Sequence, residues 1–261
     1  MKTKFIYIIG IEGCGHHGFM PIVENIISSS LNDEANLYSR WGELRKAFDR
    51  IWLAKNPLIN MRGKFQLNRL FVRLHTKKSI RDDAVYILED RSFPSKDRRT
   101  PDQGWNLYEL YERVRRHSEV YLIVLNRDPI AATFSHKDWD GGLKGHAEVI
   151  AQHLDYLSAT MKAIGVSNFR SISYEELSTN RVQVVEGIVS YLGLRNADVK
   201  KAFKDFRQSK KNWQISLDEE DIKWIQSFFD DERSNGWKVL TDQKCSLLGT
   251  QRKTEEGVRP Q

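Results

Sequence analysis

The chain has 261 residues, of which 40% are hydrophobic and 29% are charged, and this composition fits one large α/β domain with a sizeable core. Its two cysteines, Cys14 and Cys245, exclude a disulfide framework and a cysteine-based metal site, and no apolar run reaches the length of a transmembrane helix. The net charge of +6 indicates an acidic partner, such as nucleic acid, a phosphorylated cofactor, an anionic glycan or a membrane surface. A mildly basic protein without such a partner would carry the same charge.

The first apolar run follows Lys2 and Lys4, as it would in a signal peptide. However, the run "FIYIIGI" ends at Glu12 after 7 residues, and no small-residue cleavage site follows it. We therefore expect a buried strand there and a cytoplasmic protein.

Apolar and β-branched runs alternate with segments of helical spacing along the chain. The expected strands, in order, are residues 4–10, 35–40, 84–90, 119–128 and 168–174. The expected helices are residues 17–31, 43–54, 62–77, 104–117, 144–164, 180–192, 197–206 and 218–230. This alternation predicts a three-layer α/β fold of the P-loop type, with a parallel sheet of about four or five strands between helices. We expect one domain over residues 1–248 and a polar, disordered tail over 249–261.

The glycine-rich segment after the first strand is the first candidate site. Glycines at 10, 13, 15 and 18 lead into a helix, an arrangement that points backbone N–H groups at an anion. The nucleoside-triphosphatase pattern GxxxxGK[ST] is absent, because the loop has neither the Lys nor the Ser or Thr that holds magnesium. A GxGxxG match over 13–18 lacks the acidic residue expected about 20 residues later. A glycine-rich turn without any ligand also fits.

Two further segments end strands that we expect at the same edge of the sheet. Arg127 closes the strand at 119–128, and Ser135 follows eight residues later, so the two side chains can converge on one phosphate. The alternative is that Arg127 pairs with Asp128 or Glu89 and Ser135 lies on the surface. "YEEL", which begins at Tyr174, is followed by a helix that ends in "LGL", and alone this looks like scaffold.

Together these segments resemble the sulfotransferases that use 3′-phosphoadenosine 5′-phosphosulfate (PAPS). In that family a glycine-rich loop follows the first strand, an Arg precedes a Ser by eight residues, and a "YEDL"-type segment leads to a helix ending near "LGL". The late segment "KKNWQISLDEEDIKWIQSFF" looks like the family's C-terminal stretch. The resemblance spans residues 4–230 and rests on the order and spacing of short motifs.

The resemblance implies that PAPS binds and that no metal is needed. The loop would bind the 5′-phosphosulfate through Gly13, Cys14, Gly15, His16, His17, Gly18 and Phe19. Arg127 and Ser135 would bind the 3′-phosphate, Tyr174 would lie near the adenine, and Lys210 and Lys211 would close over the 3′-phosphate.

The loop departs from the family where a cation is usual. The family has Lys or Arg two residues before the glycine that matches Gly15, and Ser or Thr after that glycine; here these positions are Gly13, His16 and His17. Sulfuryl transfer needs donors or positive charge where charge develops on the bridging oxygen. We expect His16 or His17 to supply this, and the alternative is that one packs while the other caps the helix.

A base must accept the proton of the acceptor hydroxyl. Cytosolic members use a His where this chain has Ser92, whereas glycan- and protein-modifying members use a Glu shortly after the first loop and helix. Glu43 matches that Glu, and Asp90 and Glu89 are the alternatives, in which case Arg91 would face the substrate.

The resulting expectation is a sulfotransferase that acts on a hydroxyl of a carbohydrate or glycolipid. The segment 62–81, which has seven basic residues and no acidic one, would be a wall facing an acidic substrate or simply a solvated helix face. The alternatives are a nucleotide or small-molecule kinase, which the missing loop Lys disfavours, and a non-catalytic anion-binding module. No nucleic-acid motif is present, so we expect no nucleic-acid partner.

Overall fold

The computed structural model describes residues 4–31, 37–39, 42–76, 85–88, 106–116, 118–138, 141–204 and 216–230. Within them, parallel strands form one sheet in the order β2-β3-β1-β4-β5. The strands are β1 (Lys4–Gly10), β2 (Leu37–Ser39), β3 (Val85–Leu88), β4 (Glu119–Asn126) and β5 (Phe169–Ser173). The predicted parallel α/β architecture is therefore confirmed.

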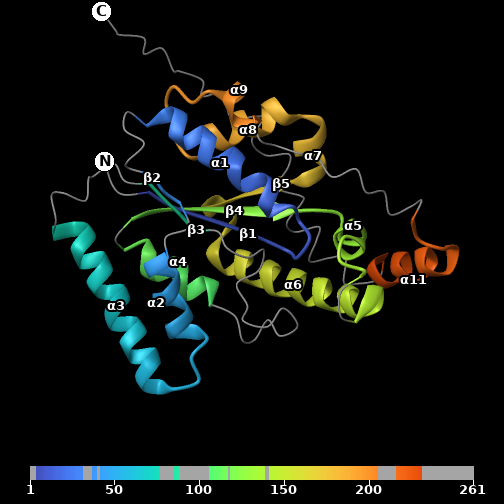
Figure 1. Ribbon diagram of the computed structural model, residues 1–261, viewed down its shortest axis with the longest axis horizontal. Helices are drawn as coiled ribbons and strands as arrows, with labels where there is room; N and C mark the ends of the chain where they lie inside the picture. The colour runs from blue at the N-terminus through green and yellow to red at the C-terminus, as the bar shows by residue number, and fades with distance from the viewer. Residues whose placement is uncertain are drawn as a thin grey trace, which may run out of the picture.

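Helices cover both faces of the sheet (Figure 1). One face carries α1 (His16–Ser30), α7 (Tyr174–Thr179), α8 (Arg181–Tyr191) and α9 (Val199–Ala202). The other face carries α2 (Gly42–Trp52), α4 (Leu107–Val114) and α6 (Gly142–Ile164), and α3 (Pro57–Thr76) lies outside α2. Beyond one end of the sheet lie α5 (Pro129–Phe134) and α11 (Glu219–Asp230), while the 3₁₀ turn η3 (Val166–Asn168) leads into β5.

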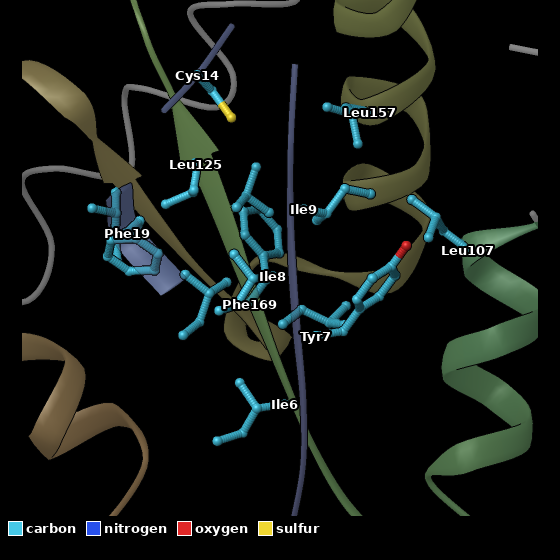
Figure 2. Close-up of a cluster of buried hydrophobic side chains, with 14 of the residues drawn as sticks. Ile6, Tyr7, Ile8, Ile9, Cys14, Phe19, Leu107, Leu125, Leu157 and Phe169 are labelled. Carbon is cyan, nitrogen blue, oxygen red and sulfur yellow. The ribbon is translucent and has the colours of Figure 1, made fainter. Parts of the chain in front are cut away.

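The central strand β1 is buried on both faces, which explains its continuous apolar sequence. Ile6 and Ile8 point to the side of the sheet that holds Phe19, whereas Tyr7 and Ile9 point to the opposite side, toward Leu107 and Leu157 (Figure 2). Successive side chains of a strand alternate between faces, so one short run contributes to two halves of the core.

The structure differs from the sequence prediction in the bounds of several helices. Helix α3 begins at Pro57, five residues before the expected start, because Asn56 accepts a hydrogen bond from the Leu58 N–H and Pro57 suits a first helical position. Tyr174, expected as the last residue of a strand, instead begins α7, which precedes the expected helix at 180–192. Helix α9 ends at Ala202, and residues 205–206 of the expected helix lie outside the described residues.

The "LGL" segment is the C-terminal cap of α8. Gly193 has a φ of 59°, and the N–H of Leu194 reaches back to the carbonyl of Val189 at 3.0 Å, as in a Schellman motif. The carbonyl of Leu192 accepts a hydrogen bond from Nζ of Lys4, the first residue of β1. This motif therefore joins the end of α8 to the start of the central strand.

Candidate active site

Three neighbouring strands bring the predicted binding segments to one edge of the sheet. The glycine-rich loop follows β1, Arg127 follows β4 and Tyr174 follows β5. Because β1, β4 and β5 are adjacent and parallel, their carboxyl ends lie together, where ligands bind in open α/β sheets.

Gly15 forms the turn from the loop into α1 and is in contact with Tyr174. Its φ of 84° lies in the left-handed region, and a Cβ atom there would lie 2.8 Å from the Tyr174 ring. Both the backbone conformation and the close approach of the ring therefore require glycine at this position.

Gly13 has no space around it for a side chain. With φ of 80°, a Cβ atom there would lie 2.6 Å from both the Ala132 carbonyl oxygen and the Ser135 hydroxyl. It would also lie 3.0 Å from Nδ1 of His136. The end of α5 therefore fills the space that a side chain on Gly13 would need.

Arg127 lies against this loop and is buried. Its Nη1 donates to the Gly13 carbonyl oxygen at 2.8 Å, and its guanidinium carbon lies 4.8 Å from the centre of the Tyr174 ring. Its Nε has no hydrogen-bond partner among the described residues, although the side chain is only 9% exposed. A buried guanidinium donor without an acceptor is costly, and an anion beside it would satisfy the donor.

Asp128 and Glu175 hold the turns that follow β4 and β5 together. The side chain of Asp128 caps α5 by accepting from the Ile130 N–H at 3.1 Å. Glu175 accepts from the Asp128 N–H at 3.0 Å and from the Ser173 hydroxyl at 2.8 Å. Burial raises the pKa of Asp128, and the negative charge of Glu175 raises it further.

Ser135 directly follows α5, about two turns after that helix begins at Pro129, and is its C-terminal cap. The Ser135 hydroxyl donates to the Ala132 carbonyl oxygen at 2.7 Å and lies 2.8 Å from Nδ1 of His136. Nε2 of His136 faces the buried carboxylate of Glu12 at 3.8 Å.

The two histidines of the loop differ in exposure. His16 and His17 are the first two residues of α1, and their ring centres are 3.8 Å apart. His16 is buried, whereas His17 is exposed.

Several loop residues predicted to bind the cofactor already have backbone hydrogen bonds or core contacts within the protein. The backbone N–H of Cys14 donates to the Ile11 carbonyl, and those of Gly18 and Phe19 donate to the Gly15 carbonyl. Figure 2 shows the side chains of Cys14 and Phe19 in the apolar core. Burial raises the pKa of the Cys14 thiol to about 12.

Of the three candidate bases, only Glu43 lies within the described residues. Glu43 is the second residue of α2 and comes shortly after β2. Glu89 and Asp90 lie outside the described residues, as do Arg91, Ser92, Lys210, Lys211 and the tail 249–261. Within the described part of the chain, no group of three or more His, Cys, Asp or Glu residues is arranged to hold a metal ion.

Sequence reasoning missed Glu12, His136 and Glu175. For Glu175 a signal existed: Ser173 and Glu176 have the spacing of a capping box, and the Ser173 hydroxyl accepts from the Glu176 N–H. That pattern predicts a helix at Tyr174 and hence a fixed position for the residue beside it. Glu12 and His136 belong to different segments, and no local pattern links them.

No family model and no curated protein matches the chain. Among solved structures, a sulfotransferase from Alicyclobacillus acidocaldarius matches with a TM-score of 0.52 and 13% identity, over 91% of this chain and 95% of that one. Mouse sulfotransferase SULT7A1, solved in complex with PAP, matches with a TM-score of 0.51 and 14% identity, over 90% of this chain and 88% of that one. The chain has a sulfotransferase fold. At these identities the sulfotransferase fold alone is shared.

Proposed function

We propose that the protein transfers a sulfuryl group from PAPS to a hydroxyl of an acceptor. The observation that carries this proposal is Arg127, a buried guanidinium placed between the glycine-rich loop and Tyr174 in a sulfotransferase fold. Its Nε has no acceptor within the described part of the chain. An anionic ligand at this point would pair the donor and would lie beside the N-terminus of α1.

The residues present fit an adenosine bisphosphate. Arg127 and Ser135 would hold the 3′-phosphate, and the Tyr174 ring would lie near the adenine. Because the N–H groups of Cys14, Gly18 and Phe19 already have acceptors, the 5′-phosphosulfate would use N–H groups of Gly15 and His17 instead. The cofactor supplies the sulfuryl group and a phosphate leaving group.

His17 is the better of the two candidates for the missing loop cation. It is exposed at the start of α1, whereas the ring of His16 is buried beside it. A histidine there would donate an N–H bond or a positive charge to the leaving phosphate, where negative charge develops.

Glu43 is the candidate base, with Asp90 and Glu89 as alternatives. It follows β2, whose carboxyl end lies at the same edge of the sheet as the loop. The acceptor in this proposal is a carbohydrate or glycolipid hydroxyl, since a Glu base is the pattern of the glycan-modifying members that the sequence resembles.

Calorimetric titration with adenosine 3′,5′-bisphosphate tests the cofactor class. We expect binding by the wild type, a loss of about a hundredfold in Arg127→Ala, and no change in Arg195→Ala, which removes an exposed arginine elsewhere. Absence of wild-type binding, or binding of ATP with magnesium in its place, would overturn the proposal.

Turnover assays then separate the catalytic roles. With radiolabelled PAPS and a panel of carbohydrate and glycolipid hydroxyls, His17→Ala and Glu43→Gln should lose turnover while retaining the bisphosphate. If Glu43→Gln stays active, the base is Asp90 or Glu89, and if His17→Ala stays active, the role of His17 is wrong.

A further inference from the structure

Helix α3 exposes an unusual concentration of large apolar side chains. Among the described residues, six large hydrophobic side chains are exposed to solvent, and four of them are on the first three turns of α3. Leu58, Met61 and Phe65 are 71%, 65% and 68% exposed, and Ile59 is 43% exposed. Single exposed apolar residues are ordinary, whereas a contiguous group marks an interaction site.

The opposite side of α3 is fixed against α2. A Cβ atom on Gly63 would lie 2.7 Å from Cβ of Arg50 and 3.0 Å from the Ala47 carbonyl oxygen, so the two helices touch there. Leu67, four residues later, is fully buried. Leu58, Met61 and Phe65 have the i, i+3, i+7 spacing of a single face, and that face points away from α2. Figure 1 shows α3 at the outer margin of the molecule, with α2 between it and the other helices.

Basic residues accompany this apolar face. Arg62 and Arg69 are exposed and lie on the same side of α3, each four residues after an apolar member, Leu58 or Phe65. Lys64 is also exposed but lies near the carboxylate of Glu109, which partly offsets its charge. The sequence of α3, residues 57–76, contains no acidic residue.

We propose that this face, made of Leu58, Met61, Arg62, Phe65 and Arg69, docks the protein on a membrane surface rich in anionic lipids. An interfacial helix buries its apolar side chains at the level of the lipid headgroups, and long basic side chains beside them reach the phosphates. Among the described residues no helix is long and apolar enough to cross a bilayer, so the contact is peripheral.

Two other occupants fit the face less well. A second copy of the chain, packed about a two-fold axis, would bring Arg62 and Arg69 of one copy toward the same arginines of the other without a carboxylate from α3 to offset them. A polyanion such as a sulfated glycan would pair with the arginines but would leave three large apolar side chains in water. Of these three occupants, only an anionic lipid surface both buries the apolar side chains and pairs with the arginines.

Vesicle co-sedimentation of the full chain tests the proposal. We expect binding to vesicles of phosphatidylcholine mixed with phosphatidylglycerol and little binding to phosphatidylcholine alone. The triple variant Leu58→Ser, Met61→Ser, Phe65→Ser should bind mixed vesicles at least about tenfold more weakly. The variant Arg62→Gln, Arg69→Gln should lose about fivefold for each charge removed, and salt should weaken wild-type binding.

Matched variants control for unspecific effects. Val182→Ser with Tyr108→Ser removes exposed apolar side chains from other helices, and Arg116→Gln with Arg195→Gln removes exposed arginines; both should bind vesicles as the wild type does. Equal binding to both kinds of vesicle, or full binding by the triple variant, would overturn the proposal. So would a dimer in light scattering that the triple variant abolishes, or vesicle binding that depends on the arginines alone.

Discussion

The guanidinium of Arg127 and the carbonyl oxygen of Gly13 are joined by a hydrogen bond of 2.8 Å that ties the end of β4 to the glycine-rich loop. A positive charge is therefore present at the loop although the loop itself contains no Lys or Arg. This contact makes several consequences of substitution predictable.

Ser135→Ala should weaken binding of adenosine 3′,5′-bisphosphate much less than Arg127→Ala. The Ser135 hydroxyl already donates to Ala132, so donating to a phosphate would exchange one hydrogen bond for another, and the net loss should be about 1 kcal/mol. The Nε of Arg127 is a charged donor that has no acceptor among the described residues. Loss of the Arg127 side chain should therefore cost about 2–3 kcal/mol of binding free energy. Calorimetry on both variants measures the difference, and equal losses would contradict it.

Gly13→Lys, which introduces a cation into the glycine-rich loop, should not increase activity. A side chain there meets the Ala132 carbonyl and the Ser135 hydroxyl, in a left-handed conformation that non-glycine residues adopt at a cost of about 1 kcal/mol or more. We expect lower bisphosphate affinity and a lower melting temperature. Gly145→Lys, at a position with open space around it, is the control and should keep both. A gain in sulfuryl transfer by Gly13→Lys would show that the end of α5 can move away.

Asp128→Asn should stabilise the protein at neutral pH. The pKa of Asp128 is raised in the folded state, so its carboxyl group favours folding when protonated and loses that contribution as the pH rises from the ordinary value of 3.8 through the raised value. Asn can still cap α5 and carries no charge toward Glu175.

The advantage of Asp128→Asn should therefore be absent near pH 3 and reach on the order of a few degrees in melting temperature by about pH 7. Asp198→Asn, at the exposed cap of α9, should show no comparable gain across this range. A constant difference between Asp128→Asn and the wild type at all pH values would refute the role of this carboxyl group.

Cys14 should resist thiol reagents in the folded protein. Its pKa of about 12 leaves about one thiolate in ten thousand at pH 8, and the side chain is buried. In a Cys245→Ser background, labelling with a disulfide reagent should be slow and should become fast in denaturant. Labelling of the native protein at the rate of a free thiol would contradict this.

The sequence predicted the architecture well where periodicity is strong. The run at 4–10 and the helix that ends at Ile164 have the spacing and length of buried elements, and both lie within two residues of the expected bounds. The contact between Gly13 and the end of α5 could not be predicted from the sequence, because it depends on tertiary packing between segments more than 100 residues apart. The sequence also could not predict that His16 is buried and His17 is exposed, because the two residues are adjacent and their burial depends on how α1 packs.

Strand order has a consequence for synthesis of the chain. The strand β1 emerges first, yet it lies at the centre of the sheet, and its neighbours begin only at Val85 and Glu119. Until β3 and then β4 have been made, the apolar run Phe5 to Ile9 lacks its strand neighbours, and an apolar strand in that state is prone to aggregate. Sheet formation is therefore governed by contacts distant in sequence, and this favours slow folding.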